Sequence, residues 1–284
     1  MENLTARTLY LVATPIGNLE DITLRALRVL RGCDLVAAED TRHTAKLLHY
    51  YDIRKPAVSL HDHNEQQKSA ELVARLAAGG IIALVSDAGT PAVSDPGFKL
   101  VRAAIDAGVR VEAIPGPSAV LAALVASGLP TDGFVFVGFP PPKARARAAW
   151  LQSLSDERRT IVFFEAPHRI QVMLSDALRV LGDRQVVIAR ELTKLHEELV
   201  RGPISEVIGR LTETRGEFTV VLAGRADHAA DSTREDIADS TIYDDFCRLT
   251  ESGLERREAI TRLANDTGLR SRAIYAAIER ARNS

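Results

Sequence analysis

The strongest constraint on the fold is a run of five apolar residues, 81–85, that leads directly into a loop at residues 86–97. The run has the length of a buried strand, and the loop is rich in Gly, Pro, Ser and Asp. Beyond the loop, Phe98, Val101 and Ile105 recur at helical spacing. Ligands of parallel α/β sheets bind at loops that follow the carboxyl ends of strands. This stretch therefore predicts a strand, a binding loop and a helix.

The loop at 86–97 has a composition suited to contact through its backbone. Gly89 and Gly97 permit backbone angles that other residues avoid, while Pro91 and Pro96 stiffen the turn. One loop of this kind is most often a simple connector. Three of them follow strands in the first half of the chain, at residues 14–21, 86–97 and 115–118, and together they favour a binding site.

The same strand, loop and helix pattern repeats along most of the chain. In the first half we expect strands at 8–13, 35–38, 57–60, 81–85 and 109–114. In the second half we expect four strands, at 134–138, 160–164, 185–189 and 217–223, with two or three helices. The expected fold class is α/β, with two α/β domains.

The composition changes after residue 226. Residues 227–251 hold eight acidic and two basic residues, which predicts a linker leading into a short helix. Two amphipathic helices joined by a turn at 265–268 follow, in a helix-turn-helix pattern. We predict an N-terminal α/β domain at 1–118, a second α/β domain at 119–225, and a linker with a helical module at 226–284.

Composition excludes several classes of protein. The 284 residues are 46% hydrophobic and 26% charged, which is typical of a soluble globular protein, and the net charge of −2 gives no overall attraction to nucleic acid. Cys33 and Cys247 match no zinc or disulfide spacing, so we expect free thiols and a cytoplasmic protein. We find no apolar run of about 20 residues, the length that spans a membrane. Neither a Walker A loop nor a G-x-G-x-x-G motif occurs, which disfavours ATP and nicotinamide cofactors.

Seven motifs in a fixed order resemble a known family. They are TPIGNLEDIT, AEDTRHT, SDAGTPAVSDPG, IPGPSA, FFEAPHR, ARELTK and EFTVVLAG, and they extend over nearly the whole chain. They look like the ribosomal RNA small subunit methyltransferase I family, a branch of the tetrapyrrole methylase superfamily. The resemblance implies two α/β domains with S-adenosyl-L-methionine in the cleft between them, and a homodimer. It also implies 2′-O-methylation of the ribose of a cytidine in the decoding region of 16S rRNA, within the small ribosomal subunit.

Departures from the porphyrin branch bear on the substrate. That branch typically has a Gly-rich first loop and a G-D-P sequence in the middle loop, whereas this chain has residues TPIG at 14–17 and SDAG at 86–89. The helix-turn-helix resembles an appendage of the rRNA enzymes. Two alternatives stay open, which are methylation of a tetrapyrrole or other small molecule and a non-catalytic role in ribosome assembly.

The superfamily's cofactor contacts map onto matching positions of this sequence. The resemblance implies that the methionine end lies against the loop after residue 86, that the next contact is a helix start, and that the adenosine is flanked by later strands. The implied cofactor-binding residues are Asp87, Ala88, Gly89, Pro91, Ser118, Ala119, Phe164, Glu191, Leu192 and Thr219.

A ribose hydroxyl loses its proton during methyl transfer, so a general base is useful. Four residues at strand ends are candidates: Asp40, His43, Glu165 and His168. Two of them have structural alternatives, because Asp40 could cap the following helix and Glu165 could pair with Arg169.

Several cations are candidates for binding RNA phosphates. These RNA-binding candidates are Arg42, Lys143, Arg145, Arg147, Arg169, Lys194, Arg270 and Arg272. The cations at 143–147 could equally form a solvated helix face, and the C-terminal helices could pack on the main body. His61, Asp62 and His63 lack a third ligand at a recognised spacing, so we expect no metal site.

Overall fold

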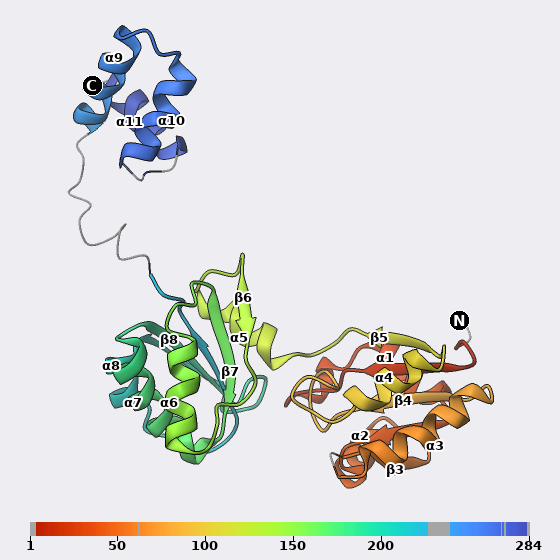
Figure 1. Cartoon of the computed structure of the whole chain (residues 1–284). Coiled ribbons are helices and arrows are strands. Elements are labelled where there is room, and N and C mark those ends of the chain that lie inside the picture. Colours follow the sequence, from red (N-terminus) through yellow and green to blue (C-terminus); the bar gives the residue numbers. More distant parts are fainter. Residues whose placement is uncertain (1–3, 62, 227–238, 268, 270, 283–284) are drawn as a thin grey trace. The chain divides into compact units, whose positions relative to one another are not determined.

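Two sheets of five strands each organise residues 8–222 of the computed structural model (Figure 1). The structure describes residues 4–61, 63–226, 239–267, 269 and 271–282. The chain divides into one unit at Met1–Arg225, which holds both sheets, and a second at Ala226–Ser284, whose described residues are mostly helical. The limits predicted above for two α/β domains within the first unit stay predictions.

The first sheet is entirely parallel, in the order β3-β2-β4-β1-β5. Its strands are β1 (Thr8–Val12), β2 (Leu35–Ala38), β3 (Ala57–Ser59), β4 (Ile81–Val85) and β5 (Arg110–Ile114). Its helices are α1 (Leu24–Gly32), α2 (Thr41–Tyr50), α3 (Glu65–Ala77) and α4 (Phe98–Asp106), with a short 3-10 helix η1 (Leu19–Asp21) before α1. Because all five strands run the same way, the loops that follow them gather at one edge of the sheet.

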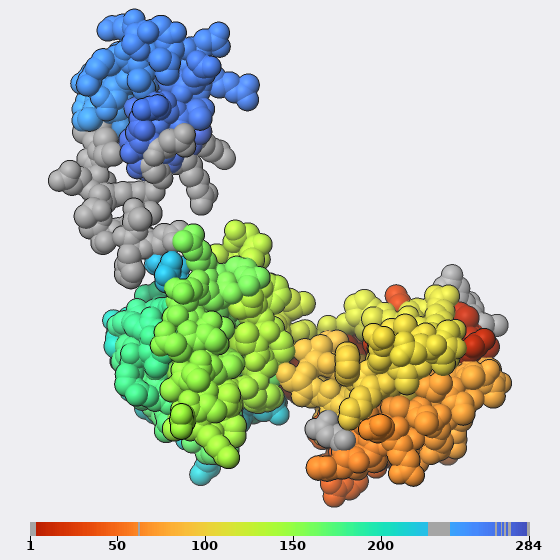
Figure 2. Space-filling view, in the orientation of Figure 1, coloured from red at the N-terminus to blue at the C-terminus, as the bar shows by residue number. Residues whose placement is uncertain are grey.

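Helices cover both faces of the first sheet. Alternate strand residues such as Val12 and Val36 pack with α1 and α2, while their neighbours Leu9 and Leu35 pack with α3 and α4. Figure 2 shows atoms of α3 and α4, in orange and yellow, over the visible face of this sheet. Burial on both faces explains why the central strands β2 and β4 are continuously apolar in the sequence.

The second sheet is mixed, in the order β6-β7-β10-β8-β9, with β6 parallel to β7 and the other neighbours antiparallel. Its strands are β6 (Phe134–Phe136), β7 (Thr160–Glu165), β8 (Gln185–Arg190), β9 (Glu198–Pro203) and β10 (Phe218–Leu222). Its helices are α5 (Ala119–Ser127), α6 (Ala144–Ser153), α7 (Ile170–Leu181) and α8 (Ile204–Arg210), with a 3-10 helix η2 (Pro167–Arg169) before α7.

The two faces of the second sheet have different partners. One face packs on α6, α7 and α8, and there Trp150 lies edge-on to Phe163 with ring centroids 5.6 Å apart. The other face packs on the apolar helix α5 and on Ile16, which follows β1. Ile16 thus joins the loop after β1 to the core of the second sheet.

The helical unit contains α9 (Asp239–Glu251), α10 (Arg256–Thr267) and α11 (Ser271–Arg282). Its core includes Ile242, Leu263 and Ile274. The guanidinium of Arg256 lies over the rings of Phe246 and Tyr275. Within its described residues, the segment expected as a linker thus ends in a helix of 13 residues, because Ile242 gives that helix a buried contact.

The sequence-based fold class is confirmed, with α/β architecture and a helical C-terminal region. The strand β9 and the helix α8 were not predicted individually. In the parts of the chain that the structure describes, no helix has the length and apolar character needed to cross a membrane.

Candidate functional site

Three loops meet at the carboxyl edge of the first sheet, after β1, β2 and β4, which are neighbours in it. Thr14 and Gly89 exchange two backbone hydrogen bonds, of 2.9 and 3.0 Å, and so tie the loop after β1 to the loop after β4. The N–H of Asp40 donates to Oδ1 of Asp87 at 3.0 Å, which ties the loop after β2 to the same place. These contacts fix the backbone of the three loops relative to one another.

A cavity of about 360 Å³ opens between this edge and the second sheet. Seven of the ten predicted cofactor-binding residues line it: Asp87, Ala88, Gly89, Ser118, Ala119, Phe164 and Thr219. The catalytic candidate Glu165 lines it as well. The structure therefore brings together residues that are up to 132 positions apart in the chain, from Asp87 to Thr219.

The other three predicted cofactor-binding residues are not among the residues that line this cavity. Pro91 is buried in the loop after β4, and Leu192 is buried against the core cluster that includes Phe164. Oε1 of Glu191 accepts hydrogen bonds from the N–H of Glu217 and from Nζ of Lys194. Glu191 supports the cavity wall, because Glu217 is one of the lining residues.

One position in the cavity wall, residue 216, accommodates only glycine. Gly216 has a φ of +95°, and a Cβ at this position would lie 2.6 Å from side-chain atoms of Glu191. Gly216 lines the cavity. A larger residue at position 216 would therefore displace either the backbone of the cavity wall or the carboxylate of Glu191.

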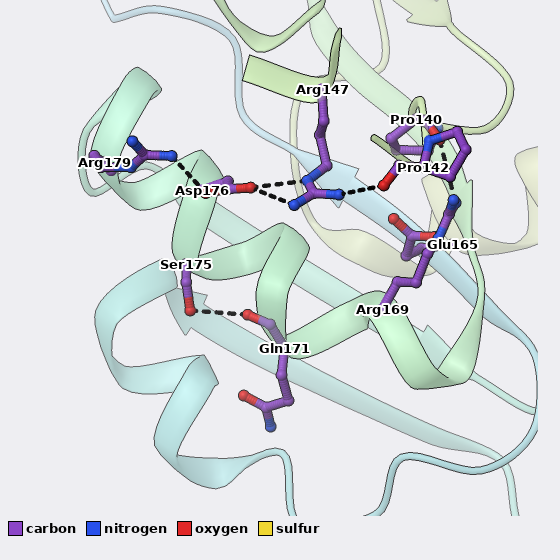
Figure 3. Close-up of polar contacts among 9 residues, drawn as sticks. All are labelled: Pro140, Pro142, Arg147, Glu165, Arg169, Gln171, Ser175, Asp176 and Arg179. Carbon is purple, nitrogen blue, oxygen red and sulfur yellow. Dashed lines mark hydrogen bonds and ion pairs between the residues drawn. The ribbon is translucent and has the colours of Figure 1, made fainter. Parts of the chain in front are cut away.

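Glu165 is the most unusual side chain of the cavity, because it is a fully buried carboxylate with one free oxygen. Its Oε1 accepts hydrogen bonds from the N–H of Ala166 and from Nε of Arg169, both at 2.7 Å. Figure 3 shows Glu165 beside Arg169. Its Oε2 is buried and has no hydrogen-bond partner among the described residues. A buried acceptor without a partner costs about 1–3 kcal/mol, so this oxygen is poised to accept a hydrogen bond from a ligand.

The other three catalytic candidates occupy different places. Asp40 caps α2, and its bidentate pair with Arg42 holds the pKa of its carboxyl far below the usual range. His43 is exposed on α2 and lines a second pocket, described below. His168 is exposed in η2 and lines neither of these two pockets.

The loop after β4 is held from outside by Glu65, a residue that the sequence analysis did not select. The Glu65 side chain is buried, and its Oε1 accepts hydrogen bonds from the N–H groups of Gly97 and Lys99, at 2.9 and 2.8 Å. It thus serves as the cap of α4 from another helix. Nothing in the local sequence reveals this, because the partners lie 32 and 34 positions away.

The predicted RNA-binding cations differ in availability. Lys143 and Arg145 are exposed on α6 and just before it, and the Arg42 side chain is 88% exposed although it pairs with Asp40. Arg147 is only 6% exposed, and its guanidinium binds Asp176 and the carbonyl of Pro142 (Figure 3).

Two further cations are also paired. Arg169 pairs with Glu165 and donates to the carbonyl of Pro140 (Figure 3). Burial lowers the pKa of Lys194, but its pairing with Glu191 and Glu217 outweighs burial and raises that pKa.

Three predicted residues fall where the structure gives no side-chain description. Arg270 and Asp62 lie outside the described residues, and Arg272 lies in α11 with its side chain outside the description. His61 and His63 lie with ring centroids 6.0 Å apart. No cluster of three or more candidate metal ligands is found among the residues that the structure describes.

The sequence analysis did not select several residues that line the cavity, and two of them, Phe139 and Glu39, had a usable signal in the sequence. Phe139 is exposed, and its ring centroid lies 5.4 Å from that of Phe164. Its position directly after a strand and before three prolines was a usable signal. Glu39 also lines the cavity, and its place next to the catalytic candidate Asp40 at the end of β2 was a comparable signal.

Comparisons with known proteins agree with this architecture. The family model of tetrapyrrole (corrin/porphyrin) methylases matches residues 8–208. A Synechocystis sp. protein named ribosomal RNA small subunit methyltransferase I is 49% identical over 270 residues, which cover 94% of this chain and 95% of the relative. A Vibrio cholerae protein of the same name is 52% identical over 227 residues, covering 78% of this chain and 79% of the relative.

Solved structures support the fold alone, because sequence identity to them is low. Uroporphyrin-III C-methyl transferase from Thermus thermophilus, complexed with S-adenyl homocysteine, superposes with a TM-score of 0.53 at 23% identity. The match covers 76% of this chain and 97% of that one. A diphthine synthase superposes with a TM-score of 0.58 at 17% identity, covering 76% of this chain and 90% of that one.

Proposed function

Because this chain belongs to the tetrapyrrole methylase family and, within it, to the ribosomal RNA small subunit methyltransferase I group, we propose that it methylates RNA of the small ribosomal subunit. The proposed cofactor is S-adenosyl-L-methionine. The proposed acceptor is the 2′-hydroxyl of a cytidine in the decoding region of 16S rRNA. The observation that carries the proposal is the cavity at the carboxyl edge of the first sheet, with its unpartnered acceptor on Glu165.

The chemistry of the cavity fits this cofactor. Its volume of about 360 Å³ lies in the range of pockets for ligands of this size, which is about 300–1,000 Å³. The first backbone N–H groups of α5, at Ala119 and Val120, have no acceptor within the helix and suit a carboxylate. The free Oε2 of Glu165 suits an amino or hydroxyl donor, and Phe164 offers an aromatic face to a base.

Bound S-adenosyl-L-methionine supplies a methyl group on a cationic sulfur, so attack by a ribose oxygen forms an O–C bond, breaks the S–C bond and leaves neutral S-adenosylhomocysteine. The role of this chain is to position the two reactants, which can lower the barrier by about 7–11 kcal/mol. The proton of the hydroxyl must leave, and we assign it to the imidazole of His43. His43 has an exposed ring without a hydrogen-bond partner among the described residues, and its pocket shares Asp87 with the cofactor cavity.

The remaining candidates have other proposed roles. The strong pair with Arg42 makes Asp40 a poor base. Lys143 and Arg145 are the cations proposed to bind phosphate, because both are exposed. The homodimer implied by the resemblance stays a prediction, which light scattering of the purified protein tests.

The decisive experiment is transfer of radiolabelled methyl from S-adenosyl-L-methionine to small ribosomal subunits. We expect label in a nucleotide that resists alkaline hydrolysis, since a 2′-O-methyl group blocks cleavage at that site. Gly89→Arg should abolish both transfer and cofactor binding, because Gly89 lines the cavity and has a φ of +76°. His43→Ala should lower kcat by about 10²–10⁴-fold, the usual contribution of a general base, with unchanged cofactor affinity.

Label in a porphyrinogen instead of RNA would refute the proposed substrate. Absence of cofactor binding by the wild type would refute methylation altogether and favour a non-catalytic role. A His43→Ala variant with full activity would refute the assignment of the base alone.

A further inference from the structure

A second pocket, of about 370 Å³, lies between α2 and the loop after β1. It shares Asp87 with the cofactor cavity. Thr14 lines the second pocket and Gly89 lines the cavity, and the backbones of these two residues are hydrogen-bonded to each other, so the two pockets are adjacent. We propose that this second pocket, the acceptor pocket, binds the RNA nucleotide whose ribose receives the methyl group, an inference that rests on the function proposed above.

One wall of the acceptor pocket comes from a single face of α2. His43, Lys46 and Tyr50 follow one another at intervals of three and four residues, so they lie on the same side of the helix. Tyr50 is 61% exposed, and an exposed aromatic ring in a pocket is a surface on which a base can stack. Pro15 and Leu19 supply apolar surface from the loop after β1.

The charge of the acceptor pocket suits a phosphate. Lys46 has no ion-pair partner among the described residues, and His43 and His49 add two imidazoles. Asp87 is the one carboxylate in the lining, and its Oδ1 already accepts the N–H of Asp40. A pocket that offers a flat ring, apolar surface and a free cation matches a nucleotide, which carries a base, a sugar and an anion.

The position of the acceptor pocket suits the acceptor nucleotide rather than a more distant one. A ligand in it and a ligand in the cofactor cavity would both contact Asp87. The volume of about 370 Å³ is in the range of pockets that enclose a small ligand, which starts at about 300 Å³. A base must leave its stack to enter such a pocket, as enzymes that modify nucleotides commonly require.

The test compares steady-state methylation of small ribosomal subunits by three variants of α2, Tyr50→Ala, Tyr50→Phe and Lys46→Glu. Stacking on an aromatic side chain is worth about 5- to 150-fold in affinity, so Tyr50→Ala should raise KM for subunits by at least about fivefold. Tyr50→Phe keeps the ring and should stay close to wild type. Lys46→Glu should raise KM, whereas Arg102→Glu, the same charge change on α4 at the opposite face of the sheet, should not.

Cofactor affinity, measured by calorimetry, should be unchanged in all four variants. Placing benzoylphenylalanine at position 50 identifies the contact directly, and a photo-crosslink to rRNA is expected. If wild type is active and both Tyr50→Ala and Lys46→Glu match it, the acceptor pocket is refuted while the proposed function stands. A crosslink to ribosomal protein alone also refutes the pocket. If wild type transfers no methyl to RNA, the proposed function fails, and this inference fails with it.

Discussion

Replacing Glu65 by alanine tests whether the loop after β4 depends on a carboxylate supplied by α3. Glu65 is 4% exposed and accepts two backbone N–H groups at the start of α4. Its Oε2 also lies 3.8 Å from Nζ of Lys99. The substitution removes Oε1, the acceptor of both hydrogen bonds, and it leaves the N–H of Gly97 buried without that partner.

The expected destabilisation follows from these two hydrogen bonds. A hydrogen bond to a charged group contributes about 1.5–3 kcal/mol when its partner is buried, as the N–H of Gly97 is. The N–H of Lys99 is partly buried, so water can replace the carboxylate and its loss costs about 1 kcal/mol. We therefore expect Glu65→Ala to lower the free energy of unfolding by about 3 kcal/mol. For a unit of this size that corresponds to a fall in Tm of about 6–12 °C.

The assay is thermal and urea unfolding of the full chain, followed by circular dichroism, together with calorimetric binding of S-adenosyl-L-methionine. Glu65→Gln keeps one acceptor oxygen without charge and should lie between alanine and wild type. Glu71→Ala, at an exposed position of the same helix, should cost less than about 0.5 kcal/mol, because it breaks only surface ion pairs. A Glu65→Ala variant as stable as Glu71→Ala would refute the reasoning.

Three further predictions concern a buried ion pair, a glycine and a cation. Asp176→Asn should cost about 2–3 kcal/mol at pH 7, because it weakens charge-assisted hydrogen bonds from Arg147 and Arg179. Burial raises the pKa of Asp176, but two arginines outweigh it and lower that pKa, so the stabilisation is present above pH of about 4, the unfolded value, and is lost as pH falls through the folded pKa. The free energies of unfolding of variant and wild type, measured by urea titration, should therefore converge at acid pH. A difference between them that does not change with pH would contradict this. Gly216→Ala should weaken cofactor binding in calorimetry, because the added Cβ would lie too close to the side chain of Glu191. Gly79→Ala is the control, since Gly79 has a similar φ of +103° and no atom near the position of its Cβ, and it should leave cofactor binding unchanged. Equal effects of the two substitutions would refute the steric argument. Arg145→Glu should weaken subunit binding and reduce the slope of log affinity against log salt by about one in filter-binding assays, and an unchanged slope would exclude a phosphate contact.

Apolar runs and loop composition predicted most of the strands, most clearly the central strands β2 and β4, which are buried on both faces. Residues 81–85 form β4 as expected, since a run of five apolar residues bounded by Gly and by a Gly- and Pro-containing loop is typical of a buried strand. β9 was missed because its sequence, ELVRGP, includes charges, a glycine and a proline. It is an edge strand that pairs only with β8, so one side of it needs no continuous apolar pattern.

Site residues could be predicted from the sequence where they directly follow strands. They could not be predicted where a side chain's availability depends on an ion pair with a residue far away in the sequence. Asp87 and Thr219 could be selected from their motifs, and both line the cavity. Arg147 has the same local sequence context as the exposed Arg145, and only the fold shows that its guanidinium binds a carboxylate 29 positions away. Side-chain burial depends on that tertiary contact, which a local pattern does not contain.

Trp150, which contacts Phe163, gives the protein an intrinsic fluorescence probe of one region of its structure. Trp150 is the chain's single tryptophan, and it lies in the core of the second sheet. Its fluorescence therefore reports the unfolding of that core, whereas circular dichroism averages over helices and strands of the whole chain. If the two signals give one transition, both sheets unfold together as a cooperative system. If Glu65→Ala shifts the dichroism and leaves the fluorescence in place, the first sheet unfolds by itself.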